Sequence, residues 1–341
     1  MIMPIEGNNR RTFVFGKAVL CFVVLCGFFA GNGNAEWLFP AKYAGEFLST
    51  GVSARALGMG GAHVALAEDG TAAYWNPAGL SRLSRRQVSV MHSERFAGVV
   101  SYNYLGYAQP YRQTEGVALS VIALGVGDIP ITELEYPGLP IGPDNRVLEK
   151  ESSSDLELAL FVSYGKQTQK GIDLGANAKL IHKGVAGYGA WGLGFDLAAR
   201  TTLPGNIKAG AMLQDVTTTI LVWDTGQKES IVPTLKLGLA RVFEIGKLRA
   251  DITPVADIDI RFTNRRTADE GYWGSLSFNS HLGMEFCLEN TLDLRIGLDS
   301  GELTAGAGLS LYGVEADYAY LSHEDLGDTH RVSLGISWGK R

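Results

Sequence analysis

The stretch Leu292–Asp299, with the sequence LDLRIGLD, alternates large apolar side chains with charged or small ones at every second position. Successive side chains of a β-strand point to opposite faces, so this segment has one apolar and one polar face. The stretch Ile172–Leu180, IDLGANAKL, repeats the pattern. Both predict strands that separate an apolar environment on one side from a polar one on the other.

About fourteen such segments follow one another from residue 87 to the end of the chain. They lie near residues 87–92, 98–109, 115–124, 155–165, 171–182, 190–201, 206–214, 232–243, 247–257, 275–288, 291–298, 302–311, 313–321 and 329–338. The connections after even-numbered segments are short, whereas several after odd-numbered segments are long, namely 125–154, 215–231 and 258–274. An even strand count with short turns at one end and long loops at the other is typical of bacterial outer-membrane barrels.

We therefore predict an all-β fold, a fourteen-stranded antiparallel transmembrane β-barrel with a small N-terminal hatch segment. A soluble β-sandwich also has alternating strands. It does not need charged residues at nearly every second position, nor the loop pattern, so the sequence favours the barrel. A polar inner face suits a hydrated lumen. The hydrophobic fraction of 46% excludes a disordered chain, although 43 residues are glycine.

The N-terminus has the layout of a secretory signal peptide. Basic residues at Arg10, Arg11 and Lys17 precede an apolar run, and the small-residue site Gly33-Asn34-Ala35 follows it. We expect residues 1–35 to be removed by cleavage after Ala35, and the protein to reach the bacterial outer membrane. With 36 acidic against 30 basic residues, the chain offers no basic face for nucleic acid.

Residues 51–80 depart from the alternating pattern. Gly58, Gly60 and Gly61 permit tight turns and close approach of backbones. Their spacing matches neither phosphate-binding fingerprint, and no βαβ unit surrounds them. Small residues throughout suit a segment enclosed by a barrel. We predict a hatch or plug over residues 36–85 and the barrel over residues 86–341.

The stretch 53–80 adds a resemblance, above all in ARALGMGGA (54–62) and NPAGL (76–80). It resembles the N-terminal signature of the PorV/PorQ-like outer-membrane proteins, which are relatives of the FadL long-chain fatty-acid transporter family. Residues 316–320 and 325–331 extend the likeness to the C-terminus. The resemblance implies a fourteen-stranded barrel with an N-terminal hatch, and it assigns Asn76, Pro77 and Ala78 to that hatch.

Three functions remain open on the sequence. The leading one is passage of a small hydrophobic ligand through a plugged barrel embedded in outer-membrane lipid. The resemblance also implies an alternative, an accessory or shuttle barrel that binds exported protein and other components of a type IX-like secretion system. The third is a purely structural barrel. No arrangement of catalytic residues, metal ligands or cofactor-binding residues stands out, so we expect no enzyme, metal or cofactor.

Overall fold

The computed structural model describes residues 44–339 except residues 97, 264, 266–267 and 324–326. The expected leader, 1–35, and the start of the expected hatch, 36–43, lie outside the described residues. An antiparallel sheet closes on itself, because β1 (Arg86–Arg95) pairs with β18 (Thr329–Trp338). Fourteen of the eighteen strands described form the barrel wall, which confirms the predicted fold.

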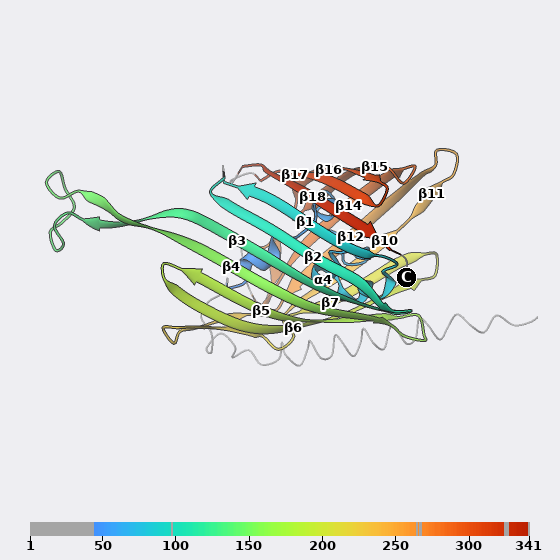
Figure 1. Ribbon diagram of the computed structural model, residues 1–341, viewed down its shortest axis with the longest axis horizontal. Coiled ribbons are helices and arrows are strands. Elements are labelled where there is room, and N and C mark those ends of the chain that lie inside the picture. Colours follow the sequence, from blue (N-terminus) through green and yellow to red (C-terminus); the bar gives the residue numbers. More distant parts are fainter. Residues whose placement is uncertain (1–43, 97, 264, 266–267, 324–326, 340–341) are drawn as a thin grey trace, which may run out of the picture.

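The remaining wall strands are paired with their neighbours around the barrel (Figure 1). In chain order they are β2 (Val100–Arg112), β3 (Glu115–Leu134), β4 (Val147–Gln167), β5 (Asp173–Val185), β6 (Tyr188–Leu203), β7 (Ile207–Gln214), β10 (Thr234–Arg241), β12 (Ala250–Arg261), β14 (Leu276–Leu288), β15 (Leu292–Asp299), β16 (Glu302–Leu311) and β17 (Val314–Leu321). Four short strands extend the connections between them: β8 (Thr219–Trp223), β9 (Lys228–Ile231), β11 (Phe243–Ile245) and β13 (Gly271–Trp273).

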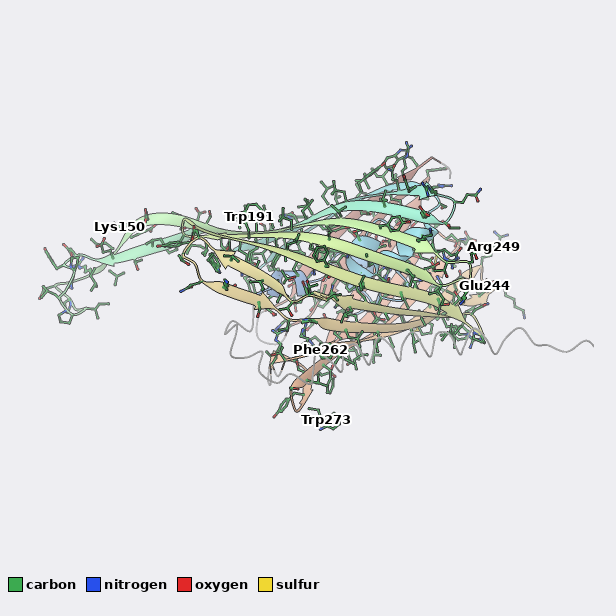
Figure 2. All side chains as sticks on the ribbon, turned by 90° about the horizontal axis from the view of Figure 1, so that it is seen from below. Lys150, Trp191, Glu244, Arg249, Phe262 and Trp273 are labelled. Atoms are coloured by element: carbon green, nitrogen blue, oxygen red, sulfur yellow. The ribbon has the colours of Figure 1, made fainter. Side chains whose placement is uncertain are left out.

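The two ends of the barrel differ in their connections. One end, called here the short-turn end, carries the start of β1, the end of β18 and most of the short turns. The opposite, long-loop end carries the hairpin β8–β9, the strand β13 and the extension of β3 and β4. In Figure 2, Glu244 and Arg249 mark the short-turn end, and Lys150 lies far beyond the long-loop end.

The prediction of a long loop at residues 125–154 is wrong. Most of them continue β3 and β4 as a two-stranded ribbon that projects past the barrel wall (Figure 1). The pairing shifts register between Val126 and Ile129, and Pro130 follows. These irregularities break the alternation from which the strands were predicted, although β-bulges and proline are tolerated in an edge ribbon.

The alternation of apolar and polar side chains matches the two faces of the wall. On β15, Leu294 and Ile296 are each 50% exposed on the outside, whereas Asp293 and Arg295 are buried on the inside. Exposed leucine, valine and isoleucine side chains recur in this way on the outer face of most wall strands. Among the described residues, no helix is long and apolar enough to cross a membrane.

Residues 44–85, called here the lumen segment, lie inside the barrel (Figure 1). They form α2 (Glu46–Ser49), α3 (Ala54–Leu57), α4 (Ala72–Trp75) and the 3₁₀ helix η2 (Pro77–Arg82). At the long-loop end, Lys183 of β5 donates a hydrogen bond to the carbonyl oxygen of Ala44. At the short-turn end, Arg82 pairs with Asp173 of the same strand at 2.7 Å. The segment therefore extends along the length of the lumen.

Many inward charged side chains are buried by this segment, whereas the sequence suggested a hydrated lumen around them. Lys179 and Asp196 are at most 2% exposed and pair with each other at 2.8 Å. Asn177, two residues before Lys179, donates a hydrogen bond to the carbonyl oxygen of Ala73 in the segment. The polar inner face therefore serves to bind the segment over much of its area.

Candidate functional site

The predicted hatch motif Asn76-Pro77-Ala78 lies fully inside the barrel. Asn76 begins η2: its side-chain oxygen accepts a hydrogen bond from the amide of Ala78 at 3.1 Å. Its side-chain nitrogen donates to the carbonyl oxygen of Val64 at 2.9 Å and lies 3.5 Å from that of Ala199 in β6. Pro77 occupies the first position of η2, where a missing N–H costs nothing. One asparagine thus joins two parts of the lumen segment and faces the wall.

The three predicted glycines meet the wall on its other side. Gly60 and Gly61 have φ of +69° and +78°, which favour glycine. A Cβ atom at Gly60 would lie 2.3 Å from the carbonyl oxygen of Leu298, and one at Gly58 would lie 3.1 Å from Cα of Gly306. Turn geometry therefore favours glycine at positions 60 and 61, and the close approach of the wall backbone favours it at positions 58 and 60.

The wall has glycines of its own where the segment touches it. Around η2, a Cβ atom at Gly116, Gly165 or Gly175 would lie 2.0–2.4 Å from backbone atoms of Leu80, Pro77 and Ala78. These three wall glycines stand on β3, β4 and β5, side by side in the sheet. Backbone-to-backbone contact of this kind leaves no room for any side chain, so wall and segment are complementary in shape.

Wall side chains also bind the backbone of the lumen segment. Asp257 of β12 accepts hydrogen bonds from the amides of His63 and Val64, at 2.7 and 2.8 Å. Thr304 of β16 accepts one from the amide of Gly60 at 2.9 Å. The bonds to Asp257 satisfy two buried amides of the segment, whereas the amide of Gly60 also donates to the carbonyl oxygen of Leu57 at 3.2 Å.

Ion pairs hold both faces of the segment. On one side, Arg55 of α3 makes a two-pronged contact with Glu285 of β14, at 2.9 and 2.8 Å. Arg295 of β15 also donates to Glu285, at 2.7 Å. On the other side, Arg200 of β6 donates to the carbonyl oxygen of Ala67 and pairs with Glu68. In each pair the wall residue is buried, so removing its partner from the segment would leave a buried charge without compensation, which is costly.

Two carboxyl groups of the segment have lowered pKa values. Burial acts to raise the pKa of Glu68, but Arg200 and Lys208 outweigh it, so the pKa lies below the ordinary 4.5. Burial likewise acts to raise the pKa of Asp69, and the nearby His63 and Arg55 bring it below the ordinary 3.8. Both groups are therefore charged near neutral pH.

The aromatic residues of α4 hold residues 48–52 of the segment in place. Tyr74 donates from its hydroxyl to the carbonyl oxygen of Leu48 at 2.6 Å, and burial raises the pKa of that hydroxyl. Trp75 donates from its indole to the carbonyl oxygen of Val52 at 2.9 Å. The two rings pack edge to face, with centroids 4.9 Å apart. The segment is thus folded on itself as well as bound to the wall.

Cavities remain on either side of the lumen segment. One lies toward the short-turn end, between the segment and β1, β17 and β18; Arg55, Asp69 and Glu315 are among its lining residues. The other lies toward the long-loop end and is lined in part by Trp75, Asp259 and His281. No group of histidine, cysteine, aspartate and glutamate among the described residues could hold a metal ion.

Sequence reasoning named the glycines and the asparagine motif but missed their partners in the wall. It predicted a polar inner face for the wall strands, and the structure buries Asp257 and Asp259 on that face. It gave no indication that Asp257 binds amides of the lumen segment. Nor did it indicate that Gly116, Gly165 and Gly175 form the contact surface for η2, called here the η2 seat. Inward position was the one available signal, and it identifies a face without identifying a partner.

No protein-family model and no curated protein sequence matches the chain. Solved structures do match. The P. putida toluene transporter TodX has a TM-score of 0.59 at 13% identity, over 85% of this chain and 99% of that one. The Ralstonia pickettii toluene transporter TbuX has 0.54 at 14%, over 85% and 98%. A Pseudomonas aeruginosa FadL homologue has 0.52 at 11%, over 84% and 98%. The chain has the fold of these proteins.

These similarities cover most of the chain. At identities of 11–14% they show a shared fold and nothing beyond it. They agree with the FadL side of the resemblance seen in the sequence. They do not confirm the PorV/PorQ side, and they lend no support to a role in type IX-like secretion.

Proposed function

We propose that this protein is an outer-membrane channel that passes small hydrophobic compounds, with the lumen segment as its hatch. The observation that carries the proposal is the fit between segment and wall, in a barrel with the fold of toluene transporters. Fourteen strands enclose more space than side chains from the wall can fill, unlike eight-stranded barrels. A segment that occupies this space keeps such a barrel closed to ions while leaving a route that opens when the segment shifts.

The environment follows from the outer face. Its exposed leucine, valine and isoleucine side chains suit contact with lipid. A closed barrel also satisfies its backbone hydrogen bonds without water, as a bilayer requires. We accordingly propose outer-membrane lipid as the surroundings of the barrel, residues 1–35 as a cleaved leader, and 36–85 as the complete hatch. We propose transport and no enzymatic reaction, since the solved proteins of this fold named above include transporters of toluene.

Uptake by cells tests the transport role. Cells that lack the gene should take up radiolabelled toluene or a related apolar compound more slowly than cells that express the protein, at equal outer-membrane integrity. Uptake of a small hydrophilic sugar serves as the control and should not change. Equal uptake of the apolar compounds in both strains, over a panel of aromatic and aliphatic hydrocarbons, would overturn the proposal.

Conductance across a planar bilayer tests the hatch separately. The intact protein should conduct ions weakly, whereas deletion of residues 44–82 should open a pore with a large, steady conductance. Migration of boiled and unboiled samples on a gel confirms that the deletion variant still forms a barrel. If the deletion leaves the conductance unchanged, the segment is not the plug.

A further inference from the structure

Two arginines face the lumen near the long-loop end without an acidic partner. Arg331 of β18 is 3% exposed, and Arg95 is the last residue of β1. Neither forms an ion pair with a carboxylate among the described residues, although nearly every other inward cation does. Asp299 attracts Arg331 electrostatically, but its carboxylate is 3.0 Å from the ring of His281. Burial of an unpaired charge is costly unless something neutralises it.

The two guanidinium groups stand close together. Thr50 of the lumen segment lies between them: its carbonyl oxygen accepts from Nη1 of Arg331 at 2.9 Å, and its hydroxyl lies 3.5 Å from Nη1 of Arg95. The ring of Phe96 lies 5.3 Å from the Arg95 guanidinium. These neutral contacts place the two cations without removing their mutual repulsion. Nε of each arginine has no hydrogen-bond partner within residues 44–339 as far as the structure describes them.

Two buried hydroxyl groups complete the same patch. Ser93 pairs across the sheet with Arg331 on one side and with Tyr102 of β2 on the other. Ser93 and Tyr102 are both fully buried, and neither hydroxyl has a hydrogen-bond partner in the part of the chain that the structure describes. Buried hydroxyls are rarely left in this state. Four inward side chains at neighbouring positions of β18, β1 and β2 thus carry hydrogen-bond donors that no described residue accepts.

We propose that Ser93, Arg95, Tyr102 and Arg331 form a binding site for a small oxyanion, such as a carboxylate or sulfate group. A guanidinium group matches the geometry of such an anion with two parallel N–H donors, and the two hydroxyls supply further donors. A bound sulfate would balance the charge of both arginines and a carboxylate would balance half of it, and either would offer acceptors to the four unpartnered groups. The site stands independently of hydrophobic transport; where the anion is the charged end of an apolar compound, it adds a specificity to that transport.

Binding of sulfate and of benzoate to the purified protein in detergent tests the site, by calorimetry at constant ionic strength set with chloride. Saturable binding of either probe is expected, and R331Q should weaken it by about tenfold or more, because hydrogen bonds to charged groups are among the stronger ones. Y102F should weaken it less, with little change in volume. The exposed Arg249 supplies the matched control, R249Q, which should bind as the natural protein does.

Comparison of the two probes identifies the source of the anion. Equal affinity for both indicates a free ion, and much tighter binding of benzoate indicates the anionic end of an apolar compound. Failure of both probes to bind the natural protein would overturn the proposal. Binding by R331Q and by Y102F that is as tight as binding by the natural protein would overturn it too. Since R331Q also loses the bond to Thr50, gel migration with and without boiling verifies its barrel, and Y102F gives an answer even if R331Q misfolds. Toluene uptake by Y102F separates this result from the proposed transport, which does not require the anion site.

Discussion

At the scale of single residues, the contact between lumen segment and wall depends on glycines, which have no Cβ atom. A Cβ atom at Gly175 would lie 2.2 Å from the backbone nitrogen of Ala78, and neither backbone has room to retreat within its sheet or helix. Any side chain at this position must therefore displace η2. Even a small side chain at Gly175 should therefore disturb the contact, because no flexible side chain is present that could move aside.

Gly175→Val should loosen η2 without opening the barrel wall, since valine is favoured in strands. Overpacking of this size costs about 1–3 kcal/mol, and the segment can avoid that cost by leaving its seat. We expect ion conductance in planar bilayers to rise severalfold. Gly246→Val, in a turn where a Cβ atom meets nothing within 4 Å, is the control. Equal conductance of the two variants would mean that the seat at Gly175 does not hold the hatch.

Asp257→Ala should release the middle of the segment. The substitution removes the acceptor of two buried amides, and each buried donor left without an acceptor costs about 1–3 kcal/mol. Hydrogen–deuterium exchange of peptides that cover residues 58–67 should accelerate at least tenfold. The matched control is Asp251→Ala, six positions earlier on β12. Faster exchange in both variants alike would point to a general loss of barrel stability instead.

At the scale of elements, the strands could be predicted from the sequence because each lies between two different environments. Alternation records this locally, so the wall strands were located to within a few residues. It fails in the β3–β4 ribbon, where both faces are in the same solvent and Gly127 and Pro130 interrupt the pattern. The site was less predictable. The hydrogen bond that the amide of His63 donates to Asp257 joins residues 194 positions apart, and no local sequence pattern identifies a partner so far away.

The lumen segment should be held less firmly in acid. The pKa values of Glu68 and Asp69 are lowered in the folded protein. Each group therefore stabilises the segment above its ordinary pKa, 4.5 or 3.8, and this stabilisation is lost as pH falls through the lowered value. Conductance should stay low from pH 8 to pH 5 and increase toward pH 3. Glu68→Gln should show a raised conductance at pH 6 and a weaker response to acid; an unaltered acid response would exclude Glu68 as its source.

At the scale of the whole molecule, the apolar outer face should set the position of the barrel in the proposed lipid bilayer. A cation placed in the middle of this face costs about 2–4 kcal/mol, and much less near the interface. Leu294→Arg, on the outside of β15, should therefore lower the free energy of unfolding in lipid by about that amount. Tyr312→Arg, in a fully exposed turn at the short-turn end, should change it little. Urea unfolding from vesicles, followed by gel migration, measures both. Equal effects would place the bilayer elsewhere on the barrel.

The connection between the lumen segment and the wall has a consequence for assembly. Three residues separate the end of η2 at Arg82 from the start of β1 at Arg86, and β1 pairs with the last strand, β18. The segment is thus tethered to the strand that closes the ring. A chain already closed would have to thread some forty residues into a narrow space, against close backbone contacts on several sides. We therefore expect the ring to close and the lumen to fill together, with residues 44–85 already in place when β1 pairs with β18.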